Sequence, residues 1–376
     1  MPEKPGKLDR IKINGFKSIE TLDLQLKPLN IIIGPNGSGK SNFIGFFKFV
    51  EKIVDKNLQF YVAQQLGSDK ILHFGRKHTR QLSFLLESTP YFTYGCTLVP
   101  DVSGGLIFVE EFFQDRTIDI EDEYNYDQKN IIGNIFNSSI VRESVLPPQL
   151  KGTERPMYRV NEIIGLLTDW RVYHFHDTSE EARIKQLCSL KDKYILQSDA
   201  GNLAAFLYSI SGTEEYRLIV KTIQRVAPFF LDFVLEPEKD NKNSIRLRWR
   251  HRATEAYFDA SDLSDGTLRF ICLTTLLLQP ELPTIILIDE PELGLHPYAL
   301  NILAAMMRTV SSKTQIIVST QAVTFANQFS WEDIIVVDLV NNKSEFRRLN
   351  EQDVADWLEE YSVGELWEKN VIGGTP

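Results

Sequence analysis

The order of hydrophobic and polar positions predicts strands and a helix in the first part of the chain. Residues 11–16 and 22–26 alternate between apolar and polar side chains, which is typical of strands with one buried face. Residues 29–33 (Leu-Asn-Ile-Ile-Ile) form a largely apolar run, as expected for a strand buried on both faces. Apolar residues then recur at helical spacing from residue 43 to about 54.

The last third of the chain shows a second clear pattern, whereas residues 81–255 are mixed in character. It predicts helices over 268–278 and 298–310 and buried strands over 284–288, 315–318 and 334–338. Strands that alternate with helices favour an α/β core with parallel strand connections. We therefore predict an α/β fold interrupted by an inserted α+β or helical region.

A glycine-rich turn between the predicted strand and helix matches G-x-x-x-x-G-K-[ST]. It reads Gly34-Pro35-Asn36-Gly37-Ser38-Gly39-Lys40-Ser41. Glycines let the backbone curl so that its N–H groups point at phosphate oxygens. Lys40 would reach the β- and γ-phosphates, and the Ser41 hydroxyl would bind Mg²⁺. The sequence therefore predicts a nucleoside triphosphate, ATP, with Mg²⁺.

Two carboxylates, Asp289 and Glu290, end the predicted strand 284–288. Ligands of parallel α/β sheets gather beyond the carboxyl ends of strands, which predicts these acids beside the phosphates. Asp289 would hold Mg²⁺, directly or through water. Glu290 would orient the attacking water and accept its proton.

A further segment resembles the signature motif of ABC-type ATPases. It reads Asp262-Leu263-Ser264-Asp265-Gly266-Thr267 and lies 23 to 28 residues before Glu290. The residues after Glu290, from Pro291 to Pro297, resemble the corresponding segment of the RecF, SMC and OLD group. With weaker flanking motifs such as Phe16-Lys17-Ser18-Ile19, the chain resembles the stand-alone bacterial ATPases of the AAA_21 family.

The resemblance implies an ABC-type P-loop ATPase head, a mixed sheet flanked by helices. Its halves would be residues 1–80 and 256–345, with the insertion at 81–255 and a helical tail at 346–376. It also implies a head-to-tail homodimer, in which Ser264 and Gly266 of one protomer face the ATP of the other.

Two positions depart from the family pattern. Gln321 stands where a switch histidine often senses the γ-phosphate, and His296 where many relatives have aspartate. Glutamine donates a hydrogen bond but carries no charge, so we expect slow or partner-dependent hydrolysis. The loop glutamine that contacts Mg²⁺ is not distinguished among Gln59, Gln64 and Gln65.

The composition limits which cellular compartment and which kinds of partner we expect. The 376 residues are 43% hydrophobic and 24% charged, which is typical of a globular protein, and the net charge of −10 argues against a globally basic DNA coat. Three dispersed cysteines fit a reducing compartment. Apolar runs such as 270–278 are about half the ~20 residues of a membrane span, and the start lacks the apolar core of a signal peptide. We expect a cytoplasmic protein that does not contact a membrane.

Local basic and acidic segments suggest partners. If residues 246–252 form a strand, Arg246, Arg248, Arg250 and Arg252 share one face that could follow DNA phosphates, or pair with the chain's many acids. A second basic cluster is Arg76-Lys77-His78-x-Arg80, whereas the acidic stretch 119–127 is typical of a solvated loop.

Two hypotheses for function follow. The ATPase would act on DNA in genome maintenance or anti-phage defence, or it would be an ATP-gated scaffold that sequesters or activates a separate effector such as a nuclease. Because only 55 residues follow Gln321, we expect any nuclease domain to lie on a partner chain.

Overall fold

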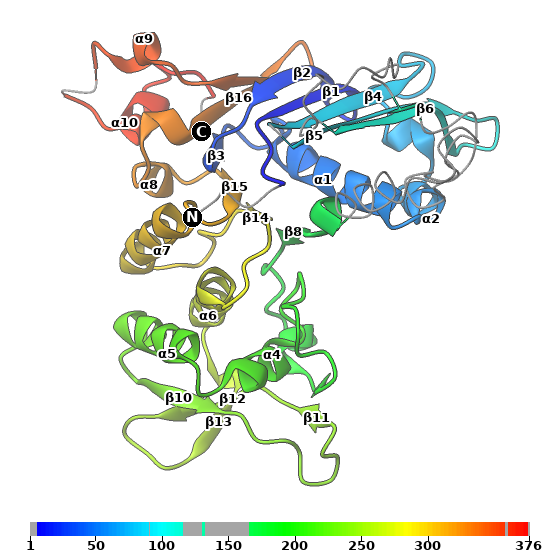
Figure 1. Cartoon of the computed structure of the whole chain (residues 1–376). Helices are drawn as coiled ribbons and strands as arrows, with labels where there is room; N and C mark the ends of the chain where they lie inside the picture. Colours follow the sequence, from blue (N-terminus) through cyan, green and yellow to red (C-terminus); the bar gives the residue numbers. More distant parts are fainter. Residues whose placement is uncertain (1–5, 90, 116–129, 132–164, 358–359, 375–376) are drawn as a thin grey trace, which may run out of the picture. The chain divides into compact units, whose positions relative to one another are not determined.

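The computed structural model describes residues 6–89, 91–115, 130–131, 165–357 and 360–374; the acidic stretch 119–127 lies outside them. The chain divides into two compact units. Unit 1 consists of Met1–Arg171, Thr284–Leu287 and Lys313–Pro376, and unit 2 of Val172–Pro283 and Ile288–Ser312. The prediction of an α/β fold with sheets flanked by helices is confirmed (Figure 1).

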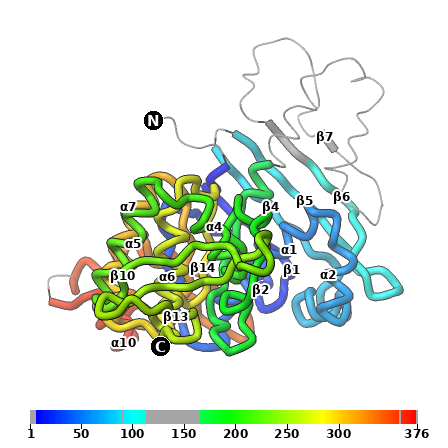
Figure 2. The backbone as a smooth tube through the Cα atoms, turned by 90° about the horizontal axis from the view of Figure 1, so that it is seen from below, coloured from blue at the N-terminus to red at the C-terminus, as the bar shows by residue number. Residues whose placement is uncertain are grey.

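The first sheet of unit 1 has the strand order β2-β1-β4-β5-β6-β7, and every neighbouring pair is antiparallel. Its strands are β1 (Arg10–Phe16), β2 (Ile19–Gln25), β4 (Leu82–Ser88), β5 (Phe92–Pro100), β6 (Leu106–Asp115) and β7 (Asn130–Ile131). β4, β5 and β6 lie side by side in Figures 1 and 2. The expected boundary at residue 80 thus falls between two paired strands, since Ile13 of β1 is opposite Phe84 of β4.

The second sheet has the order β17-β16-β3-β15-β14-β8. Its strands are β3 (Leu29–Ile33), β8 (Trp170–Tyr173), β14 (Ile285–Asp289), β15 (Gln315–Thr320), β16 (Ile334–Val340) and β17 (Lys343–Arg348). β3 is parallel to both β15 and β16, and all five of its residues are buried. Burial on both faces explains why β3 is recognisable as an apolar run rather than an alternation.

Helix α1 (Lys40–Val54) packs against strands of both six-stranded sheets through an aromatic cluster. The ring centroid of Phe46 lies 5.5 Å from that of Phe16 on β1 and 5.3 Å from that of Phe84 on β4. The ring of Phe43 lies 5.3 Å from that of Phe346 on β17. The helix that begins at Lys40 is therefore fixed by buried side chains along its length.

Short helices complete unit 1. They are α2 (Leu58–Gln64), η1 (Ser68–Lys70), α8 (Val323–Ala326), η6 (Trp331–Asp333), α9 (Glu351–Val354) and α10 (Val363–Glu368). The predicted helical tail thus contains two short helices, and Trp367 of α10 is fully buried.

Unit 2 combines helices with a small antiparallel sheet of order β10-β12-β13. Its helices are α4 (Leu203–Ile210), α5 (Glu214–Val226), α6 (Asp265–Leu278) and α7 (Pro297–Val310), with 3-10 turns η4 (Arg183–Lys185) and η5 (Ala260–Asp262). Its strands are β9 (Cys188–Ser189), β10 (Phe230–Val234), β11 (Ser244–Ile245), β12 (Arg248–His251) and β13 (Tyr257–Asp259). Trp249 stacks between Phe230 and Phe258 in the small sheet.

Within the described part of the chain, no helix has the length and apolar character needed to cross a membrane. Cys96, Cys188 and Cys272 are free thiols; Cys188 is half-buried and the other two are buried. Burial raises the pKa of all three thiols.

We expect Phe46→Ala to lower the free energy of unfolding of unit 1 by about 3–5 kcal/mol, because it leaves a cavity in the aromatic cluster. Urea unfolding followed by tryptophan fluorescence measures the change. Phe60→Ala on α2 is the matched control, since Phe60 is 66% exposed and its removal should cost less than about 0.5 kcal/mol. Equal losses from both variants would contradict the role given to the cluster.

Candidate nucleotide site

The glycine-rich turn joins β3 to α1. At two of its positions, the backbone conformation and the surrounding atoms leave no room for a side chain. Gly34 has φ 154° and Gly39 has φ 109°. A Cβ on Gly34 would lie 2.3 Å from the Val337 carbonyl oxygen, and one on Gly39 would lie 2.0 Å from Ser344 Oγ. Real Cβ atoms do not approach so closely, so both positions require glycine.

The start of α1 has the properties of an anion site. No described side chain caps this end of the helix, and no acidic residue lies in its first turn. Its N–H groups and positive dipole end therefore remain available to a phosphate. The Lys40 ammonium donates to the carbonyl oxygens of Gly34 at 2.6 Å and Pro35 at 2.9 Å, which curls it over the turn. Ser38 Oγ is buried and has no hydrogen-bond partner in the described part of the chain, and Ser41 is exposed.

Three side chains to which the sequence analysis gave no role at this turn hold it in place. Ser344 Oγ of β17 donates to the Ser38 carbonyl oxygen at 2.5 Å and lies 2.6 Å from Ser18 Oγ. Asn42 of α1 donates to Ser18 Oγ at 2.7 Å. Ser18 lies in the Phe16-Lys17-Ser18-Ile19 motif, so that motif now has a physical role. Ser344 lies 306 residues from Ser38, and no local pattern could have paired them.

The acidic pair ends β14 as expected, with an unusual backbone at its second member. Asp289 and Glu290 are half-buried, and Glu290 has φ 45°, in the left-handed region that favours glycine. His176 Nε2 lies 2.7 Å from the Asp289 carbonyl oxygen. Strain of this kind concentrates at functional sites, where the surrounding structure must impose it.

The signature segment begins α6, and Ser264 is its N-cap. The Ser264 hydroxyl accepts from the Thr267 N–H at 3.3 Å, and the side chain is exposed. A Cβ on Gly266 would lie 2.2 Å from the Gly294 carbonyl oxygen, so the start of α6 and the segment after β14 are in close contact. Arg269 stabilises that contact. Its guanidinium donates to the carbonyl oxygens of Phe175 at 3.2 Å, His176 at 2.8 Å and Leu293 at 2.9 Å.

The two departures from the family pattern occupy defined positions. Gln321 is half-buried directly after β15. His296 is the N-cap of α7, where its Nδ1 accepts from the Tyr298 N–H at 3.3 Å. Of the three loop glutamines, Gln59 donates to the Leu106 carbonyl oxygen at 2.5 Å, whereas Gln64 is exposed and Gln65 half-buried.

The strand predicted over residues 246–252 is shorter in the structure, where β12 covers only Arg248–His251. Arg248 pairs with Glu238 at 2.6 Å and with Asp259 at 3.5 Å. Arg252 Nε donates to the Phe230 carbonyl oxygen at 3.4 Å, while Arg250 is exposed and Arg246 half-buried. In the other basic cluster, Arg76 pairs with Asp69 at 3.3 Å.

Comparison with known proteins decides the family. The AAA_21 family, described as "AAA domain, putative AbiEii toxin, Type IV TA system", matches residues 29–324. The chain belongs to the AAA_21 family. This match includes both the phosphate loop and the acidic strand, and it supports the predicted assignment to the RecF, SMC and OLD group of ATPases.

A curated relative and two solved structures agree with this placement. The OLD nuclease of Thermus scotoductus (strain ATCC 700910 / SA-01) is 23% identical over 355 residues, 88% of this AAA_21 chain, which spans only 62% of that relative. An SMC head bound to the C-winged helix domain of ScpA has a TM-score of 0.60 at 12% identity, covering 93% of this chain and 99% of that one. An Smc head with an extended coiled coil, bound to the C-terminal domain of ScpA derived from Pyrococcus furiosus, has a TM-score of 0.56 at 13% identity, covering 94% and 98%. The fold is therefore that of SMC-type ATPase heads.

We expect Gly266→Ala to destabilise unit 2 by about 1–3 kcal/mol, because the added methyl group forces the start of α6 away from Gly294. Chemical denaturation measures the loss, and hydrogen exchange should increase at residues 264–269 and 291–295. Gly165→Ala is the control, since a Cβ there meets nothing within 4 Å. Unchanged exchange at both segments would contradict the contact.

Proposed function

We propose that this AAA_21 protein binds ATP with Mg²⁺ and hydrolyses it. The observation that carries the proposal is the turn between β3 and α1, whose glycines permit its tight curl and leave the first N–H groups of α1 uncapped. In the proposed complex, the β- and γ-phosphates take the place of the two carbonyl oxygens as partners of Lys40. The seven other residues of the turn, Gly34 to Gly39 and Ser41, surround the phosphates.

Mg²⁺ would be held by Ser41 and Asp289. A serine hydroxyl and a carboxylate are oxygen donors, which Mg²⁺ prefers, and the ion also keeps phosphate oxygens and waters as ligands. β3, which precedes the turn, and β14, which ends in the acids, are both neighbours of β15 in the sheet. This order supports assigning Ser41 and Asp289 to one nucleotide.

Glu290 would act as the general base, and Gln321 would contact the γ-phosphate. Glu290 is half-buried and directly follows Asp289, the proposed Mg²⁺ ligand at the end of β14. A carboxylate at this position suits the role of orienting the attacking water. Gln321 follows β15, the strand between β3 and β14. Because its amide is uncharged, we expect a low basal rate.

ATP would join two copies head to tail. Ser264 is exposed at the start of α6, where its hydroxyl and the neighbouring N–H groups are accessible to a γ-phosphate on a second chain. Gly266 permits the packing that holds this end of the helix in place. A phosphate bound by donors of two chains holds the dimer until hydrolysis removes it.

We propose that the cycle acts on DNA, in genome maintenance or anti-phage defence. One support is the relative named an OLD nuclease. The other is Arg246 and Arg250, on and beside β12, which form no ion pair within the described ranges, whereas Arg248 pairs with two acids. The alternative is an ATP-gated scaffold for a separate effector such as a nuclease, which the SMC heads bound to domains of ScpA favour.

Two substitutions separate binding from hydrolysis. Lys40→Ala should abolish binding of a fluorescent ATP analogue, because the phosphates lose their cationic partner. Glu290→Gln should bind the analogue with unchanged affinity but lower kcat by about 10²–10⁴, the usual contribution of a general base. Hydrolysis by Glu290→Gln at the wild-type rate would contradict the assignment.

Dimerisation is tested by light scattering with the Glu290→Gln protein and ATP. We expect a dimer with ATP and a monomer with ADP. Adding Ser264→Arg should restore the monomer without reducing analogue binding, because Ser264 contacts only the partner's nucleotide in this proposal. A dimer that persists with Ser264→Arg would contradict the head-to-tail arrangement.

DNA action is tested by the steady-state ATPase rate with single- or double-stranded DNA. We expect stimulation that is lost in the Arg246→Glu/Arg250→Glu double variant and kept in Arg225→Glu, which alters an exposed arginine of α5 in the same unit. A rate that ignores DNA would instead favour the scaffold, whose effector could be sought by co-purification.

A further inference from the structure

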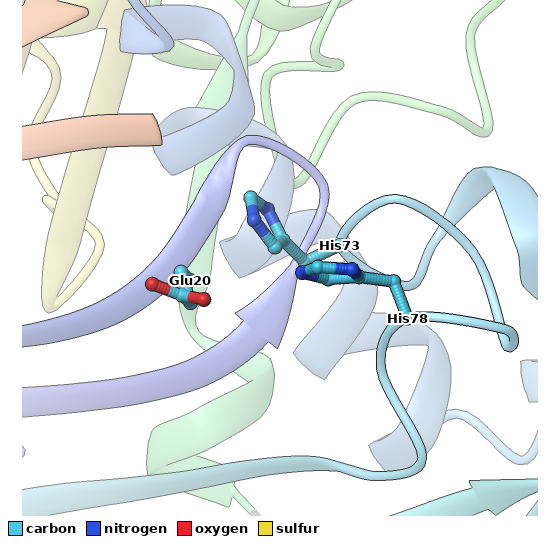
Figure 3. Close-up of side chains that lie close together, drawn as sticks. All are labelled: Glu20, His73 and His78. Atoms are coloured by element: carbon cyan, nitrogen blue, oxygen red, sulfur yellow. The ribbon is translucent and has the colours of Figure 1, made fainter. Parts of the chain in front are cut away.

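Three potential metal ligands lie together in unit 1, outside the nucleotide site. Glu20 belongs to β2, while His73 and His78 belong to the segment that follows η1. One ligand atom from each side chain lies within 4.8 Å of the other two. Figure 3 shows the two imidazole rings and the carboxylate gathered at one place. Nothing in the phosphate chemistry described above uses these residues.

The buried histidine has an orientation that suits a metal ligand. His73 is fully buried, and its Nδ1 lies 2.7 Å from the Lys17 carbonyl oxygen. Because a carbonyl oxygen only accepts, Nδ1 must carry the hydrogen, which leaves a lone pair on Nε2. Nε2 is buried and has no hydrogen-bond partner among the residues that the structure describes. A backbone carbonyl that fixes one ring nitrogen while the other faces a cation is the usual arrangement of metal-bound histidine.

The other two side chains supply the remaining donors and an entry path. His78 is exposed, and its ring centroid lies 5.9 Å from that of His73. Glu20 accepts a hydrogen bond from the Lys343 ammonium through Oε2. Lys343 is 38% exposed and can turn into solvent if a cation binds beside the carboxylate.

We propose that Glu20, His73 and His78 form a zinc site. Two imidazole nitrogens and one carboxylate oxygen are donors that Zn²⁺ accepts in tetrahedral geometry, with water in the fourth position. Mg²⁺ prefers oxygen ligands in octahedral geometry, so this site differs in chemistry from the one at Ser41 and Asp289.

The ion would connect β2 to residues 73–78, close to the residues that support the phosphate loop. Lys17, whose carbonyl oxygen orients His73, directly precedes Ser18, which contacts Ser344 and Asn42. Zinc would thus brace the β1–β2 turn that supports the phosphate loop, and it needs no part in hydrolysis.

The test is zinc titration of tag-free protein, stripped with chelator and free of nucleotide, by isothermal calorimetry. We expect one Zn²⁺ per chain, and an affinity about tenfold or more weaker in His78→Ala and in Glu20→Gln. His78 is exposed, so its variant should remain folded. His251→Ala and Glu345→Gln are matched controls on other strands, and Asp289→Asn shows whether the ion binds at the proposed nucleotide site instead.

Cobalt substitution gives a second readout. Co²⁺ bound here should show the visible absorption of a tetrahedral nitrogen and oxygen site, and the His78→Ala variant should lose it. Zinc affinity that is equal in wild type, His78→Ala and Glu20→Gln would overturn the proposal. So would binding that is lost in Asp289→Asn but kept in His78→Ala.

Discussion

The turn between β3 and α1 is the constraint on which the proposed chemistry depends. The chain must pass from a fully buried strand into a helix while its backbone approaches the Val337 carbonyl and the Ser344 hydroxyl. Only glycine fits at Gly34 and Gly39, and only an uncapped helix start leaves donors for phosphate. The aromatic residues of α1 then hold the helix against both sheets, so the donors stay in place when no anion is present.

The same turn is stabilised by residues that are distant in sequence. Ser344 of β17 donates to the carbonyl oxygen of Ser38, and Ser18, from the link between β1 and β2, contacts the Ser344 hydroxyl. Burial lowers the pKa of the neighbouring Lys17, whose carbonyl oxygen also orients His73. The phosphate loop is therefore one part of a connected group of polar residues that extends to the proposed zinc ligands.

The parts of the fold that sequence could predict are those in which local pattern and burial agree. The buried runs of β3 and β15 and the helices α1, α6 and α7 were predictable because each has a continuous apolar face or core. The positions of the turn at residues 34–41 and of the acids at 289–290 were predictable because each follows a buried apolar strand. The pairing of β1 with β4 was not, since antiparallel partners far apart in sequence share no local signal. For the same reason, the arginine pattern did not reveal that Glu238 and Asp259 pair with Arg248.

The backbone at Glu290 has an evolutionary consequence. With φ at 45°, glycine or asparagine would adopt this backbone conformation with less strain than glutamate. Such strain costs on the order of 1–3 kcal/mol of stability. Selection for stability alone would thus remove the carboxylate, and a role such as the proposed general base would keep it. If Glu290 acts as proposed, a descendant that no longer needed hydrolysis should drift towards glycine here, gaining stability and keeping its nucleotide bound.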